Sequence, residues 1–237
     1  MEILPWMMLS AALRVLTVYG GFVHLGAACA SDYCLFIAFI LAARRMIELA
    51  DGTTLLGQMT MAQQFTLAHR VLLPVGALMI VATMVVYNLG WHWVGLHMLL
   101  GFDGIAYDQQ TIDGFVWSAV LAAITLLLVI RAEITGKADL GGAFRELWQR
   151  GVYLAPAILA VAVADIGLSI AQGALRQAAY AFWQSAAAPS LVRALVFFSF
   201  IFICAAIRLW ITLAILVFAL RASYRHQAST TGSVTPS

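Results

Sequence analysis

Long apolar runs separated by short groups of charged residues dominate the pattern of this chain. A membrane-spanning helix needs about 20 apolar residues. Runs of roughly this length stand at 71–90, 115–130 and 152–174, and a longer one stands at 189–220. Each run predicts one helix that crosses a bilayer.

The N-terminal tract, residues 3–43, is also apolar and is interrupted only by Arg14 and Asp32. It can form either one long, tilted helix or two spans. We favour two spans, with a turn at 31–33 and a second helix that continues to Asp51. The whole pattern therefore predicts an all-α fold, a polytopic transmembrane helical bundle of five or six spans.

Composition supports lipid as the solvent for much of this chain. Hydrophobic residues make up 63% of the sequence and charged residues only 10%, whereas soluble domains have about half and about a quarter. The formal net charge of +2 is too small to indicate nucleic acid as a partner. The expected partners are the lipid bilayer and either other membrane subunits or further copies of this chain.

Segments with and without basic residues alternate between the predicted spans. Arginine and lysine occur in 44–70, in 131–150 and at the C-terminal end, whereas 91–112 has none. Because these residues concentrate on the cytoplasmic side, the pattern predicts a multi-pass protein of the cytoplasmic (inner) membrane. Its C-terminus is expected in the cytoplasm.

The domain organisation follows from the same pattern. Residues 1–226 are predicted to form one transmembrane helical domain. Residues 227–237 are rich in serine and threonine, and we expect them to be a disordered polar tail.

A short interfacial amphipathic helix is predicted after Asp139, a residue type that commonly caps helix N-termini. Its apolar and polar residues recur at helical spacing, and Gly151 is expected to end it. The predicted apolar face is Leu140, Phe144, Leu147 and Trp148, and the predicted polar face is Arg145, Glu146, Gln149 and Arg150. The helix is either a linker on the cytoplasmic leaflet or a docking site for a cytoplasmic partner.

Asp165 lies inside an apolar run, with Ser169 and Gln172 on the same helical face. An ionised carboxylate at this depth has to be paired, or else protonated. Arg208, central in the last apolar run, is its expected partner. The sequence thus predicts an intramembrane polar centre of these four residues, which serves either as a structural ion pair or as an ion or proton pathway.

A second group of small and polar residues lies near the N-terminus. Gly20, Gly21, His24 and Asp32 fall on one stripe if the helix is continuous there. Such a stripe is either a close helix-packing seam or a site that holds a haem or metal ligand or a proton-relay group. No second histidine is placed to pair with His24 inside the membrane, which argues against a bis-histidine haem, and the identity of any cofactor or metal is left open.

The chain contains no catalytic motif that we could identify, so no catalytic residue is assigned and enzymatic activity is left open. The leading hypothesis is an integral membrane protein that acts as a non-catalytic transport or assembly subunit with a charged intramembrane centre. The alternatives are a redox, haem-binding or metal-binding membrane subunit, and a structural scaffold in a multi-subunit membrane complex.

Overall fold

The computed structural model describes residues 3–19, 24–49, 60–88, 112–184 and 189–232, and within these ranges the chain is helical without any strand. The all-α class predicted from the sequence is confirmed for this part of the chain. Its helices are α1 (Ile3–Tyr19), α2 (His24–Leu49), α3 (Met61–Asn88), α5 (Ile112–Thr135), α6 (Leu140–Gln149), α7 (Gly151–Gln184) and α8 (Ser190–Gly232).

Three of these helices contain segments long and apolar enough to cross a membrane. The segments are Gly114–Thr135 in α5, Gly151–Phe182 in α7 and Phe202–His226 in α8. The fold is therefore compatible with a multi-pass membrane protein. The described residues do not confirm the predicted number of five or six spans.

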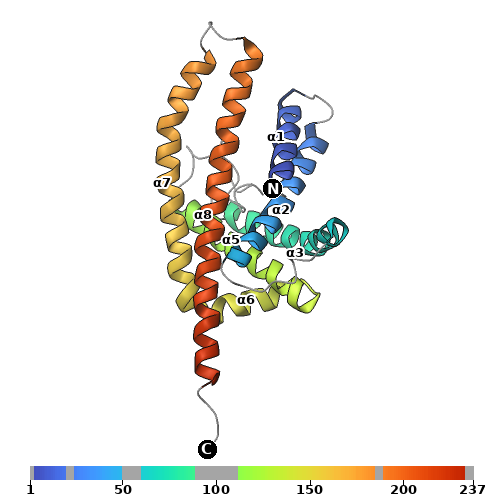
Figure 1. Cartoon of the computed structure of the whole chain (residues 1–237), viewed down its shortest axis with the longest axis vertical. Coiled ribbons are helices and arrows are strands. Elements are labelled where there is room, and N and C mark those ends of the chain that lie inside the picture. Colours follow the sequence, from blue (N-terminus) through green and yellow to red (C-terminus); the bar gives the residue numbers. More distant parts are fainter. Residues whose placement is uncertain (1–2, 20–23, 50–59, 89–111, 185–188, 233–237) are drawn as a thin grey trace, which may run out of the picture.

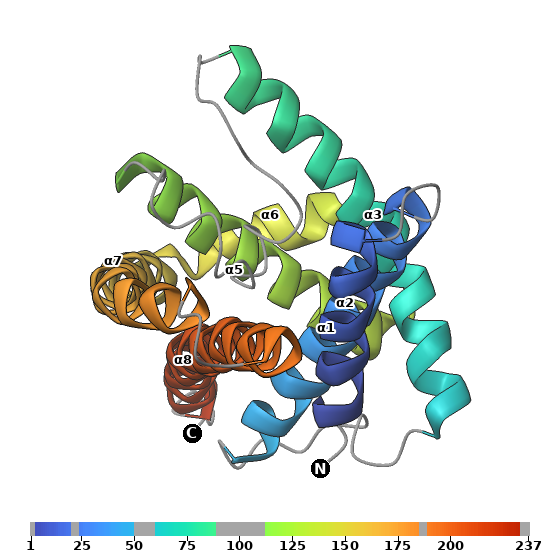
Figure 2. The ribbon, with the colours of Figure 1, turned by 90° about the horizontal axis from the view of Figure 1, so that it is seen from above.

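Two of the three long apolar helices, α7 and α8, lie side by side, and the third, α5, lies across them (Figure 1 and Figure 2). Helices α7 and α8 form a tall antiparallel hairpin (Figure 1). Seen from above, α7 and α8 are viewed nearly end-on, whereas α3 and α5 lie across the direction of the hairpin (Figure 2). The hydrophobic core forms where α2, α3, α5 and α8 meet, with α5 at its centre and Phe36, Phe39, Leu127 and Leu213 among its buried residues.

The N-terminal tract forms two helices, as expected, but the break between them lies elsewhere. Helix α1 ends at Tyr19 and α2 begins at His24, so the segment 31–33 is inside α2. The Ser31 hydroxyl donates to the Ser10 carbonyl oxygen at 3.1 Å and lies 2.8 Å from the Ser10 Oγ. Ser31 does not end the helix because its polar side chain is satisfied by the packed neighbour α1.

The start of α3 and the end of α8 also differ from the ends of the apolar runs that predicted these helices. Helix α3 begins before the run 71–90 that predicted it, because the partly polar segment ahead of this run is helical too, so Pro74 lies well inside the helix. Helix α8 continues to Gly232, and residues 233–237 lie outside the described part. The division of the chain at residue 226 stays a prediction.

Candidate functional site

The first candidate site lies where α7 packs against α8. On α7, Leu154, Ala157, Val161 and Asp165 are buried at helical spacing, and they form one face that turns toward the protein. Arg208 is buried on α8. One acidic and one basic side chain are thus buried beside small and aliphatic residues in this interface.

Asp165 and Arg208 form a bidentate ion pair. Arg208 Nε donates to Asp165 Oδ1 at 2.9 Å, and Arg208 Nη2 donates to Oδ2 at 3.1 Å. The two residues are 2% and 1% exposed. Two parallel charge-assisted hydrogen bonds make this geometry both strong and directional. The sequence predicted this pairing, while its use as an intramembrane polar centre stays a prediction.

Other polar side chains accompany the pair. Gln172 is buried and Ser169 is half-buried on α7. Thr212 is buried on α8 one turn beyond Arg208, and its Oγ1 has no hydrogen-bond partner among the described residues. Thr212 was not among the predicted site residues, although its spacing of four residues from Arg208 places both on one face of α8.

The structure describes little of the predicted stripe near the N-terminus. His24 is the first residue of α2, and Asp32 lies further along the same helix. The side chains of both, and all of Gly20 and Gly21, lie outside the described residues. The stripe therefore stays a prediction.

The remaining histidines are spread over the molecule. His69 is exposed on α3, and His226 is exposed on α8 with its ring 6.0 Å from that of Tyr153. His92 and His97 lie outside the described residues. Within the described part, no three His, Cys, Asp or Glu side chains gather closely enough to hold a metal ion.

The second candidate site is a network of charged and polar side chains around α6, here called the α6 network. Its members are Arg131 of α5, Asp139, Glu146 and Arg150 of the α6 segment, and Ser223 and Tyr224 of α8. Gly136, with φ of 71°, follows the last residue of α5, where helices commonly end in a left-handed glycine. Asp139 then caps α6 as predicted, accepting a hydrogen bond from the Gly142 amide at 3.0 Å.

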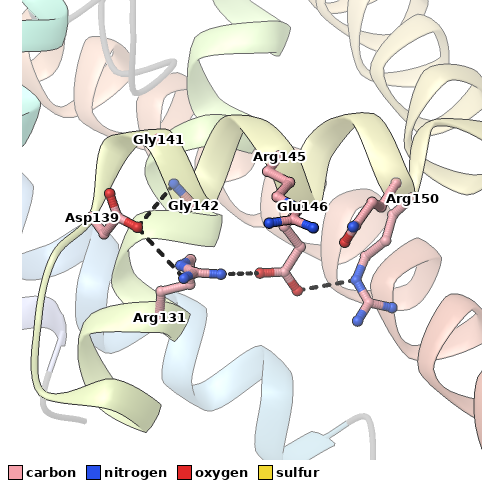
Figure 3. A pocket seen from close by; sticks show the side chains of 8 residues that line it. Arg131, Asp139, Gly141, Gly142, Arg145, Glu146 and Arg150 are labelled. Atoms are coloured by element: carbon pink, nitrogen blue, oxygen red, sulfur yellow. Dashed lines mark hydrogen bonds and ion pairs between the residues drawn. The ribbon is translucent and has the colours of Figure 1, made fainter.

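Within the α6 network, Glu146 lies between two arginines (Figure 3). Its Oε2 is 3.5 Å from Arg131 Nη1, and its Oε1 is 3.0 Å from Arg150 Nε. Arg131 Nη2 is 3.7 Å from Asp139 Oδ2. These contacts connect the end of α5 to both ends of α6.

The α6 network also reaches the C-terminal part of α8. Arg150 Nη1 donates to Ser223 Oγ at 2.9 Å, and the Tyr224 hydroxyl donates to Glu146 Oε1 at 2.8 Å. The Arg150 guanidinium carbon lies 3.7 Å from the centroid of the Tyr224 ring, which adds a cation–π contact. Helix α6 is therefore held to α5 at one side and to α8 at the other.

The predicted faces of α6 need correction. Leu140 and Leu147 pack against the core, but Phe144 is exposed and Trp148 is 88% exposed. Glu146 and Arg150 of the predicted polar face turn inward to the α6 network because their charges find partners on α5 and α8. Gly151 is the first residue of α7, and Arg150 occupies the cap position of α6.

Comparison of this chain with models of known protein families, with characterised proteins and with solved structures finds no match. Its function therefore has to be argued from the two sites described above.

Proposed function

We propose that this chain is a non-catalytic integral membrane subunit that acts in assembly or transport, with the Asp165–Arg208 pair as its intramembrane polar centre. The membrane is the cytoplasmic (inner) membrane, with the C-terminus of the chain in the cytoplasm. The observation that carries the proposal is the buried bidentate ion pair between two long apolar helices.

The geometry of the pair favours a role in assembly over a role in moving ions or protons. Both carboxylate oxygens of Asp165 accept a hydrogen bond from Arg208. A relay group has to release its partner during each cycle, and here two charge-assisted bonds oppose that release. A buried ion pair is instead suited to fixing the register of two helices, since a shifted register leaves both charges unpaired.

The outer face of α7 supports a role as one subunit among others. Leu159, Val163 and Ile170 are large, apolar and exposed at helical spacing. Only 28% of the most apolar window of α7 is buried within the chain. This surface is free to contact lipid or the helices of a partner subunit, while the ion pair holds α7 in place on α8.

The test is the Asp165→Asn variant of the full-length chain, expressed in its native membrane and extracted with a mild detergent. Co-purified proteins are quantified by mass spectrometry, and a visible spectrum is taken on the same sample. Asp165→Asn keeps the side-chain shape but leaves Arg208 without its counter-charge, so we expect stoichiometric partners to be lost. Gln177→Ala, at an exposed and uncharged position of the same helix, is the matched control and should retain them.

Two results would count against this proposal, and a third would decide between its two roles. If Asp165→Asn keeps both the folded chain and its partners, the polar centre is not required. A wild-type chain that purifies alone and colourless moves the assignment from assembly to transport through its own helices. A Soret band or stoichiometric metal would favour the redox or metal-binding alternative.

A further inference from the structure

A cavity of about 650 Å³ lies between the end of α5 and one face of α6 (Figure 3). Its volume falls within the range of about 300–1,000 Å³ that is typical of small-molecule sites. Neither predicted role of α6, the linker or the protein-docking helix, requires such a cavity. The residues that line it indicate what it could bind.

The cavity carries an excess of positive charge. Arg131, Arg145 and Arg150 line it together with only two carboxylates, those of Asp139 and Glu146. Arg131 and Arg150 are already paired with these carboxylates. Arg145 is exposed and makes no ion pair within the described part of the chain. It is therefore the source of the excess charge, and it favours an anionic ligand.

The first turn of α6 also favours an anionic ligand. Gly141 and Gly142 line the cavity. Gly141 is exposed and leaves its backbone accessible because it has no side chain, whereas the Gly142 amide already donates to Asp139 Oδ2. The N-terminal end of a helix carries a partial positive charge that stabilises anions. Space at Gly142 is limited, since a Cβ there would collide with the Arg131 guanidinium and the Asp139 carboxylate.

The surroundings of the cavity indicate where this anion comes from. Phe144 and Trp148 project from another face of α6, and Val152 is exposed just beyond it at the start of α7. Aromatic residues on a short amphipathic helix are typical of the membrane–water interface. An arginine beside such residues is suited to contact phospholipid phosphates.

We propose that this cavity binds the phosphodiester headgroup of an anionic phospholipid, with Arg145 as the main contact for the phosphate. Asp139 and Glu146 remain paired with arginines and have oxygen lone pairs for hydroxyl groups of the headgroup. A glycerol headgroup suits this donor and acceptor pattern. The proposal does not depend on the chain being a subunit of an assembly, since a chain without partners would bind the lipid equally well.

The test uses the purified full-length protein in nanodiscs and in detergent. Phosphatidylglycerol is titrated against a phosphatidylcholine background, and bound lipid is counted by native mass spectrometry. Arg145→Gln removes one charge-assisted contact to phosphate and should weaken phosphatidylglycerol binding about tenfold. Arg225→Gln is the matched control, because Arg225 is an exposed arginine of α8 that does not line the cavity.

Each outcome decides the question. Preferential binding of phosphatidylglycerol that Arg145→Gln weakens and Arg225→Gln leaves unchanged supports the proposal. Equal weakening by both variants means general attraction to an anionic surface and overturns it. If inorganic phosphate at millimolar concentration displaces the lipid and stabilises the protein to the same extent, the ligand is a soluble anion, and the lipid assignment is wrong.

Discussion

Helices α5 and α7 have almost the same hydropathy but opposite surroundings. The most apolar windows of the two have mean hydropathies of 2.2 and 2.1, yet 72% of the first and only 28% of the second are buried inside the protein. All residues from Leu121 to Val129 of α5 are buried, so this helix is surrounded by its neighbours. Helix α7 turns a single face toward α8.

The contrast between the surroundings of α5 and α7 shows what an apolar run can and cannot indicate. Hydropathy reports that a segment avoids water, but it is the same whether the segment packs against protein or against lipid. What separates the two helices is the placement of polar residues. Helix α7 carries Asp165 and Gln172 on its buried face, whereas the polar side chains described as buried on α5 are the small Ser118 and Thr125. Thr125 donates its hydrogen bond to the Leu121 carbonyl of its own helix.

Breaking the buried ion pair between α7 and α8 should have the greatest effect on stability. Asp165→Ala leaves the buried Arg208 charge uncompensated, and the cost of breaking such a pair is about 3–5 kcal/mol. Thermal unfolding of the purified protein in detergent should show a large drop in melting temperature.

A double variant separates the charge from the packing. In Asp165→Leu/Arg208→Met both charges are replaced by apolar side chains, so we expect a stability close to that of the wild type. A double variant as unstable as Asp165→Ala would contradict this, because it would mean that α7 needs the ion pair itself. A stable double variant that has lost its partners would assign the pair to assembly.

The next effect compares the apolar contacts of the two helices directly. Leu127 of α5 is fully buried, and Leu127→Ala should cost about 2–5 kcal/mol because it opens a cavity in the core. Leu159 of α7 is 61% exposed, and Leu159→Ala should change stability by no more than about 0.5 kcal/mol. Chemical denaturation of both variants under the same conditions measures how much unfolding free energy each of them loses. Similar losses at the two sites would mean that the outer face of α7 is covered as tightly as the core.

The variant Val163→Asp tests whether lipid covers the outer face of α7. Val163 is exposed and apolar, and an aspartate at the centre of a membrane-spanning helix costs about 2.5–3.5 kcal/mol. Val163→Asp should therefore reduce the fraction of the chain that is inserted in the membrane, as measured by fractionation and protease protection. Gln149→Asp introduces the same group on the exposed polar surface of α6 and should insert normally. Normal insertion of Val163→Asp would show that lipid does not contact this face.

The sequence predicted those parts of the fold that depend on local pattern and on the avoidance of water. The apolar runs located α5, α7 and α8, Asp139 identified the start of α6, and the isolated charges indicated the contact of Asp165 with Arg208. Each of these follows from spacing along one helix or from the high cost of an unpaired charge in an apolar environment.

Other features depend on contacts between distant segments, and the sequence did not reveal them. The crossing of α5 over the α7–α8 hairpin depends on which apolar faces meet, and hydropathy is the same for all of them. The inward turn of Glu146 and Arg150 depends on Arg131 and Tyr224, which lie on other helices. The predicted turn at 31–33 was wrong because Ser31 finds its hydrogen-bond partner on α1.

The smallest expected effect concerns the α6 network, which holds the end of α5 to α8 without a fully buried charge. Tyr224→Phe removes the hydrogen bond from the Tyr224 hydroxyl to Glu146 but keeps the ring over Arg150, so it should cost about 1 kcal/mol. Tyr153→Phe is the matched control, because the Tyr153 hydroxyl makes no hydrogen bond within the described residues and only its ring contacts His226. When the free energies of unfolding of the two variants are measured in parallel, that of Tyr224→Phe should be the lower one by about 1 kcal/mol. A loss at Tyr224 as large as that at Asp165 would mean that the α6 network, and not the buried pair, is the main polar contact holding α8 to the rest of the molecule.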